Sequence, residues 1–352
     1  MEFLSSIHEN LKKIDERDIE YIDLFDYPEL IYGNVNVNSR LNFCKFPRNV
    51  QDEMEKYGTG VLNEMKQFNS SSSGNRLRVK TDSKRIVFKI QLNRKYDFIN
   101  INNTNSFGFD VYNVINGQYI HENVFSPGDG NNIFAHEIEV PENGEICIFL
   151  PNYNSILSFF MGFEKGSSFE TLKYPQGKRL PVLFYGNAVT QGASASRSGN
   201  SFTNILSRLL DRDMINVSCS SCCKATDNTA DFLGKINCHA IVIDYTHNAY
   251  DTEEFMRTHE RFYKKIRQYH PDTKIVLMTS ENFNFWKSYD EYDEIVKNTY
   301  DNARIHGENV ELINQRQLFD ENEYDIVSVD DTHYSDYGMY IVAKKLCEII
   351  GE

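Results

Sequence analysis

The sequence lacks any apolar run that approaches the roughly 18 residues needed to span a membrane as a helix. Basic residues are also few, because 37 Lys and Arg stand against 51 Asp and Glu, which gives a formal net charge of −14. Nucleic acids and anionic membrane surfaces repel a chain of this charge. We therefore predict neither a nucleic-acid partner nor a membrane partner.

The sequence also shows no disulfide framework and no secretory signal. Its seven cysteines are an odd number, and Cys222 and Cys223 are adjacent, a usage that fits a reducing compartment. Residues 1–17 mix acidic and basic side chains, without the basic start, apolar middle and small-residue cleavage site of a signal. We expect a cytoplasmic protein, and the alternative is a secreted protein whose signal is missing from this sequence. Because Cys219 and Cys222 have no second ligand pair at matching spacing, we predict neither a metal nor a cofactor.

Residues 1–175 have the pattern of a first, mainly β domain. Short runs rich in β-branched and aromatic residues are separated by Asn-, Gly- and Ser-containing turns, which is typical of a β-sandwich or jelly roll. The expected strands are residues 30–37, 76–80, 85–92, 107–114, 133–140, 145–151 and 156–163. A helix is expected at residues 3–13, and residues 166–180 have the composition of a linker.

Residues 176–352 alternate between strand-like and helix-like segments. The expected strands are 182–185, 214–217, 240–245, 274–279 and 310–313, and the expected helices are 202–210, 226–233, 252–268, 289–305 and 337–350. Such alternation predicts a parallel sheet covered by helices on both faces. Reactive groups in such sheets gather beyond the carboxyl ends of the strands.

Polar residues follow several of these strand ends, and they provide most of what acyl transfer needs. Asp330 and His333, three residues apart, can supply a carboxylate and a base, and Asn248 can supply an amide donor. The strand at 182–185 ends at Gly186, where a sharp turn into a helix would present a nucleophile. The residue at that position is Ala188, whose methyl group cannot attack an ester.

Four short blocks of the second half resemble those of the SGNH (GDSL-like) hydrolase family. In chain order the blocks contain Gly186-Asn187-Ala188 with Thr190, Ser221 after Asn216 and Ser220, Asn248, and Asp330-x-x-His333. Longer stretches resemble a bacterial subgroup with a leading β-sandwich, namely residues 185–194, 195–199, 244–248 and 258–260, with 70–83 and 148–151 in the first half. The resemblance implies a jelly-roll-like β-sandwich followed by a flavodoxin-like α/β/α hydrolase domain.

The resemblance also implies roles for the site residues. His333 would be the general base and Asp330 its orienting carboxylate, with the nucleophile at the position of Ala188. The backbone N–H groups of residues 188 and 221 and the side chain of Asn248 would form the oxyanion hole. Three further residues are weaker candidates for substrate contacts: Asn187, Arg197 and His247.

Two positions depart from the family pattern. Ala188 replaces the nucleophilic serine, and Ser221 replaces a glycine, which would store strain if the backbone there needs a positive φ. The first departure has two explanations, an engineered Ser→Ala change or a natural protein that binds without cleaving. We expect a serine esterase that removes acetyl or other short acyl groups from a carbohydrate or related small ester, inactivated at Ala188. The alternatives are a carbohydrate-binding pseudoenzyme and an acyltransferase with the same triad.

Overall fold

A computed structural model describes residues 14–35, 40–93, 98–128, 131–281, 283 and 289–351. The helix expected at residues 3–13 lies outside this range. None of the described helices is both long and apolar enough to cross a membrane.

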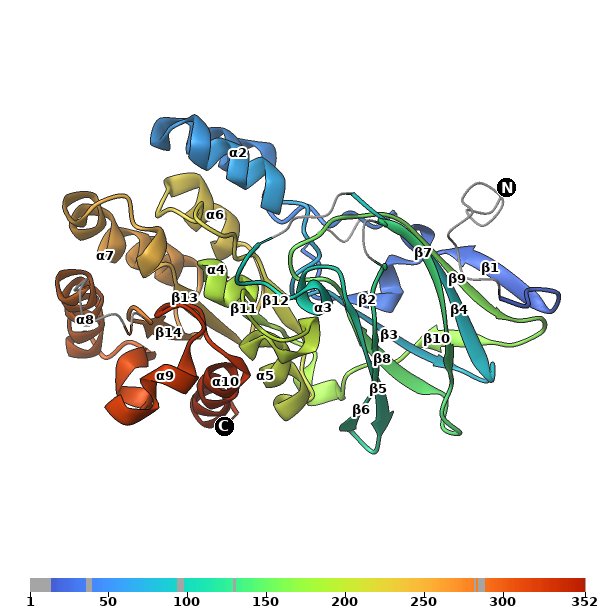
Figure 1. Cartoon of the computed structure of the whole chain (residues 1–352). Coiled ribbons are helices and arrows are strands. Elements are labelled where there is room, and N and C mark those ends of the chain that lie inside the picture. The colour runs from blue at the N-terminus through green and yellow to red at the C-terminus, as the bar shows by residue number, and fades with distance from the viewer. Residues whose placement is uncertain are drawn as a thin grey trace.

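The first half contains two antiparallel sheets packed face to face (Figure 1). One has the order β1 (Ile19–Asp23), β9 (Ile156–Glu164), β4 (Arg85–Leu92) and β7 (Ile133–Glu139). The other has the order β10 (Phe169–Thr171), β3 (Arg76–Thr81), β8 (Glu145–Phe149), β5 (Phe109–Ile115) and β6 (Gln118–Phe125), with β2 (Ile31–Tyr32) paired to β3. Phe88 of the first sheet packs against Phe125 of the second, with ring centroids 5.3 Å apart. The predicted β-sandwich is therefore confirmed.

Several details of this half differ from the expectation. Strands β1, β6 and β10 were not foreseen, the run at 30–37 yields only the short β2, and β10 recruits part of the expected linker into a sheet. A helical segment was also missed, consisting of α1 (Arg48–Glu53), a 3-10 turn (Met54–Tyr57) and α2 (Thr59–Phe68). The apolar residues of this segment have helical spacing and pack into the core of the second half rather than into the sandwich. Phe46, just before the segment, packs against Tyr185 in the same core.

The second half is built on a five-stranded parallel sheet. Its order is β12 (Met214–Asn216), β11 (Val182–Gly186), β13 (Ala240–Asp244), β14 (Lys274–Met278) and β15 (Val310–Ile313). The chain therefore winds in both directions from β11, so the carboxyl end of β11 lies at the switch point of the sheet. Doubly wound sheets of this order place their functional groups there.

Helices cover both faces of the parallel sheet, as predicted (Figure 1). One face carries α6 (Asp227–Gly234), α7 (Thr252–Tyr269) and α8 (Asp290–Ile305), and the other carries α5 (Phe202–Leu210) and α10 (Asp336–Ile350). Alternate residues of β11 serve the two cores: Leu183 and Tyr185 enter one, and Val182 and Phe184 enter the other. This two-sided burial explains why β11 is apolar at every position up to Gly186.

Candidate active site

The site begins with a sharp turn at the end of β11. Asn187 caps the short helix α4 (Ala188–Gln191), because its side-chain oxygen accepts hydrogen bonds from the backbone N–H groups of Val189 at 2.8 Å and Thr190 at 3.3 Å. Gly186 is required just before it, since a Cβ there would lie 2.3 Å from the Thr190 Oγ1 and 2.5 Å from the backbone oxygen of Asp244. The turn thus fixes the position of the first helical residue.

Ala188 is that first residue, and it lies half-buried. Its backbone oxygen accepts a hydrogen bond from the hydroxyl of Tyr153 at 3.0 Å, and the same hydroxyl lies 2.8 Å from the Ser220 Oγ. Tyr153 comes from the end of the β-sandwich and is buried. The leading domain therefore contacts the nucleophile position directly.

The two predicted oxyanion blocks lie beside this turn. The backbone N–H of Cys219 donates to the oxygen of Gly186 at 3.2 Å, which joins the β12 loop to the end of β11. The buried Asn248 side chain donates to the oxygen of Cys219 at 3.1 Å through an amide that carries two donor hydrogens. Ser221, which follows in this loop, is exposed and has a φ of +61°. The site does require positive φ where the family pattern has glycine, as the sequence suggested.

Asp330 and His333 form a hydrogen-bonded pair on the loop before α10. The His333 Nδ1 lies 2.9 Å from both carboxylate oxygens, and the backbone N–H of His333 donates to the Oδ1 at 2.9 Å. Burial acts to raise the pKa of Asp330, but the hydrogen bonds from His333 outweigh it and hold that pKa well below its ordinary value. The carboxylate is therefore ionised and accepts a hydrogen bond from the N–H at the Nδ1 of His333. The Nε2 of His333 is then the nitrogen that can act as a base.

Backbone strain is concentrated around these residues. Five non-glycine residues of the described chain have positive φ, and three of them are on the loops of the site: Ser194 at +63°, Ser221 at +61° and Asp331 at +65°. Left-handed conformations cost L-residues free energy and persist where the surrounding structure imposes them. The clustering agrees with the prediction that these loops form a functional site.

The predicted substrate contacts of Asn187 and His247 are not evident from their surroundings. Asn187 is buried, and its amide donates to the Glu281 Oε1 at 2.6 Å while its oxygen caps α4. His247 places its Nε2 3.6 Å from the Glu281 Oε2, with the side chain 13% exposed. Both residues thus contact the buried carboxyl group of Glu281, and a role for either in substrate binding stays a prediction.

The two carboxyl groups of Asp244 and Glu281 are buried next to the turn. Gln315 donates to the Asp244 Oδ1 at 3.0 Å and to the Glu281 Oε2 at 3.2 Å, and the Thr190 hydroxyl donates to the Asp244 Oδ2 at 2.5 Å. Burial raises the pKa of Asp244 to about 7 and raises the pKa of Glu281 well above its ordinary value. Both shifts favour a proton on this pair, which reduces the repulsion between two carboxyl groups that lie close together under α4.

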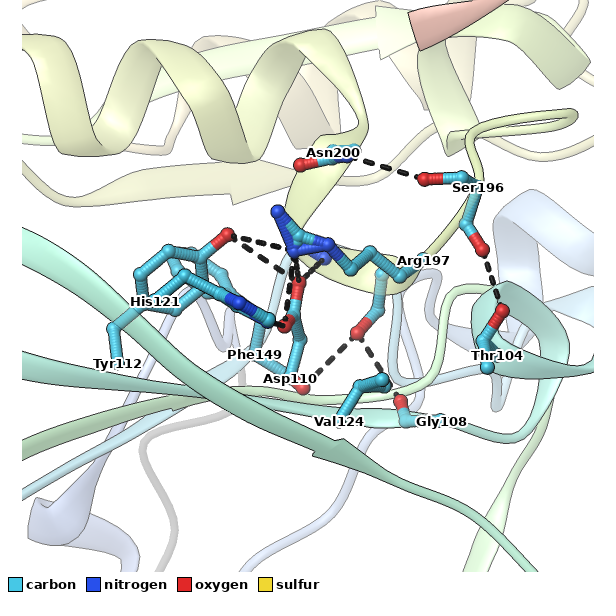
Figure 2. A network of polar contacts seen from close by, with 12 residues as sticks. Thr104, Gly108, Asp110, Tyr112, His121, Val124, Phe149, Ser196, Arg197 and Asn200 are labelled. Carbon is cyan, nitrogen blue, oxygen red and sulfur yellow. Dashed lines mark hydrogen bonds and ion pairs between the residues drawn. The ribbon is translucent and has the colours of Figure 1, made fainter.

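Arg197 lies at the contact between the two halves of the molecule (Figure 2). Its Nη1 is 3.3 Å from the Oδ2 of Asp110, a fully buried carboxylate of β5, and 3.5 Å from the Tyr112 hydroxyl. The Asp110 carboxylate also accepts from the backbone N–H of Gly199 at 2.9 Å and lies 3.0 Å from the His121 Nε2. These contacts occupy Arg197 in holding the domains together, so its predicted contact with substrate remains without support.

Two residues that contact the candidate site were not predicted from the sequence, one beside the Asp330–His333 pair and one beside the turn. Asn100 of the leading domain donates its amide to the Asp330 Oδ2 at 2.8 Å, and Tyr153 contacts Ala188 as described. Both lie in irregular segments of the first half, where periodicity carries no information. No signal in the sequence alone indicated either residue.

Two family models match the chain. The model of the GDSL-like lipase/acylhydrolase family matches residues 179–351, and the model named GxDLY, the N-terminus of SGNH hydrolase-type esterases, matches residues 19–169. The pattern in the second name fits Gly108-Phe-Asp-Val-Tyr112, with Val111 in place of Leu. The Asp and Tyr of this pattern are the residues that face Arg197, so a family pattern could have identified this contact.

Solved structures share the architecture over most of the chain. A GDSL-like lipase from Bacteroides ovatus has a TM-score of 0.74 at 24% identity, covering 95% of this chain and 98% of its own. A salicylyl-acyltransferase from a tetracycline biosynthetic pathway has a TM-score of 0.74 at 18% identity, covering 95% and 97%. A family two carbohydrate esterase from Clostridium thermocellum, in complex with cellohexaose, has a TM-score of 0.54 at 13% identity, covering 79% and 92%. No curated protein matches the chain.

Proposed function

Because the chain belongs to the GDSL-like lipase/acylhydrolase family and carries the leading domain of SGNH hydrolase-type esterases, we propose that its site is that of a serine esterase. The substrate would be a carbohydrate, or a related small ester, that bears acetyl or another short acyl group. Ala188 stands at the nucleophile position, so the chain as written binds such an ester without cleaving it. The fold shared with carbohydrate esterases supports the choice of a sugar.

The observation that carries this proposal is the Asp330–His333 pair, with its 2.9 Å contacts and an ionised carboxylate. In the serine form, the Nε2 of His333 would take the proton of the attacking hydroxyl, and Asp330 would stabilise the imidazolium that results. The N–H groups of residues 188 and 221 and the Asn248 amide would stabilise the oxyanion. Water would then release the acyl group with His333 again as base.

The test is the Ala188→Ser variant, assayed on p-nitrophenyl acetate and on acetylated xylo-oligosaccharides. We expect hydrolysis to rise by at least about a hundredfold over the unchanged chain, because the serine and histidine of a triad act as a unit. Ala188→Gly, which changes the same residue without adding a hydroxyl, is the matched control. Ala188→Ser combined with His333→Gln should return the rate to that of the control.

Two alternatives give other outcomes in the same assay. A natural carbohydrate-binding protein is favoured by Ala188 itself, and it would bind the acetylated sugar equally well before and after Ala188→Ser, with no gain in hydrolysis. An acyltransferase is favoured by the fold shared with the salicylyl-acyltransferase over 95% of the chain. It would hydrolyse slowly in water and form a new ester when an acceptor alcohol is added.

A further inference from the structure

The leading domain contacts the acid–base pair through one side chain. Asn100 lies in the segment between β4 and α3 (Asn103–Ser106), and its Nδ2 donates to the Asp330 Oδ2 at 2.8 Å. The same Nδ2 lies 3.3 Å from the His333 Nδ1. An amide from the first half of the chain is therefore within hydrogen-bond distance of a carboxylate 230 residues later.

This contact adds a third donor to the Asp330 carboxylate. Oδ1 accepts from the backbone N–H of His333, both oxygens lie within reach of its Nδ1, and Oδ2 also accepts from Asn100. The Asp330 side chain is 36% exposed, so water would otherwise occupy the outer side of the carboxylate. A fixed donor restricts rotation of the carboxylate about its χ2 angle, and with it the plane of the imidazole.

Asn100 is itself anchored from two sides. Its backbone oxygen accepts from the Ser194 hydroxyl at 2.6 Å, and Ser194 is a left-handed residue six positions after Ala188. The ring of Phe98, in the same segment, packs 5.7 Å from the ring of Tyr153, whose hydroxyl donates to the oxygen of Ala188. The segment therefore links the loop after the nucleophile position to the loop of the acid–base pair.

We infer that Asn100 is a positioning residue of the acid–base pair, which the leading domain supplies to the active site. The inference rests on the proposed function for its meaning in catalysis, and it concerns the orientation of Asp330 and His333 rather than contact with substrate. The triad itself lies in the second half of the chain, and the first half would supply the side chain that orients its carboxylate. A purely structural contact at the domain boundary would leave the geometry of the pair unchanged.

The first measurement uses the chain as it stands, without any nucleophile. The proton on the His333 Nδ1, hydrogen-bonded to a carboxylate, gives a downfield imidazole resonance in the proton NMR spectrum, assigned by its loss in His333→Gln. We expect Asn100→Ala and Asn100→Leu, which is similar in size and lacks a donor, to shift this resonance or broaden it by exchange with water. Asn103→Ala, which changes an exposed asparagine three residues later, is the matched control and should leave it unchanged.

The second measurement is kinetic and uses the Ala188→Ser background. There Asn100→Ala should lower kcat by about tenfold or more with KM within twofold, because misplacing a catalytic group slows chemistry without weakening binding. Thermal unfolding of each variant shows whether it is folded. If Asn100→Ala is unfolded, Asn100→Leu, which is similar in size and removes the donor without adding a charge, decides the question.

The outcomes separate this inference from the proposed function. An imidazole resonance identical in Asn100→Ala, Asn100→Leu and the parent would overturn the positioning role, whatever the kinetics show. An Ala188→Ser variant without activity would overturn the proposed function, while the resonance would still report on Asn100. A fall in kcat in Asn103→Ala as large as that in Asn100→Ala would also count against a specific role for Asn100.

Discussion

The hydroxyl of Tyr153 donates a hydrogen bond to the backbone oxygen of Ala188 at 3.0 Å. This bond crosses from the β-sandwich to the first residue of α4, and the same hydroxyl lies 2.8 Å from the Ser220 Oγ in the oxyanion loop. One buried side chain of the leading domain thus touches both the nucleophile position and the loop that would hold the oxyanion. The two halves of the chain therefore meet at the candidate site.

We predict that Tyr153→Phe lowers the free energy of unfolding by about 1 kcal/mol, because the backbone oxygen of Ala188 loses one of its three donors and keeps the N–H groups of Gly192 and Ala193. The free energy of unfolding in urea measures this change. Tyr340→Phe, whose side chain is exposed on α10, is the control and should change that free energy by less than about 0.5 kcal/mol. Equal values for the two variants would show that the Tyr153 hydroxyl contributes nothing to the contact.

A second prediction concerns the left-handed backbone at Ser221. Glycine adopts a φ of +61° without the steric penalty that a Cβ imposes, so Ser221→Gly should raise the free energy of unfolding by about 1 kcal/mol. Ser221→Ala keeps the Cβ and should give no gain, which separates backbone strain from loss of the hydroxyl. In the Ala188→Ser background, Ser221→Gly should retain esterase activity, because the N–H that faces the oxyanion is kept.

The sequence predicted the second half of the fold in detail. The helix at 202–210 and the strand at 310–313 were placed at the observed bounds, and the other expected elements differ from the observed ones by one residue at one or both ends. The parallel strands are continuous apolar runs because they are buried on both faces, and the helices have a helical period because one face of each is buried. Their order then fixed where the strand ends, and so the site residues, come together.

The first half was predicted less well for a physical reason. Strand β6 is mostly exposed, so it lacks the apolar alternation that a half-buried strand displays. The helices at 48–68 pack on the core of the other domain. An apolar helix face does not show from the sequence which domain it packs against. Asn100 and Tyr153 act through tertiary contacts alone, and such contacts leave no local pattern in a sequence.

The ion pair at the domain boundary gives a third prediction. Asp110 is fully buried against Arg197, and burial raises the pKa of Asp110 although Arg197 opposes this change. Removing one partner leaves a poorly compensated charge, so Asp110→Ala should lower the free energy of unfolding by about 3 kcal/mol. The cost should be smaller when Arg197→Ala is already present, and a double-mutant cycle measures that coupling.

The matched comparison for this cycle is the pair of Lys80 and Glu145, with a contact of 2.9 Å and side chains 47% and 23% exposed. Its coupling should be no more than about 0.5 kcal/mol, as for other solvent-screened pairs. A coupling for Asp110 and Arg197 of the same small size would mean that the network in Figure 2 aligns the domains without stabilising them.

The last prediction follows from the buried carboxyl of Asp244, whose pKa is raised to about 7 by burial. In the unfolded chain this carboxyl releases its proton near pH 4, so between pH 4 and 7 the folded protein holds a proton that the unfolded chain does not. Its contribution to stability is therefore complete below pH 4 and is lost as the pH rises through 7, by up to about 1.4 kcal/mol per pH unit.

Asp244→Asn removes this titration while keeping the shape of the protonated carboxyl. The free energy of unfolding of the variant, minus that of the parent, should therefore increase from pH 5 to pH 7 and stay constant above pH 7. Taking the difference cancels every group that titrates alike in both proteins, and Asp325→Asn, at an exposed position, controls for the loss of one carboxylate. A difference that is constant from pH 5 to 8 would mean that Asp244 is ionised throughout, and that the Thr190 and Gln315 hydrogen bonds outweigh its burial.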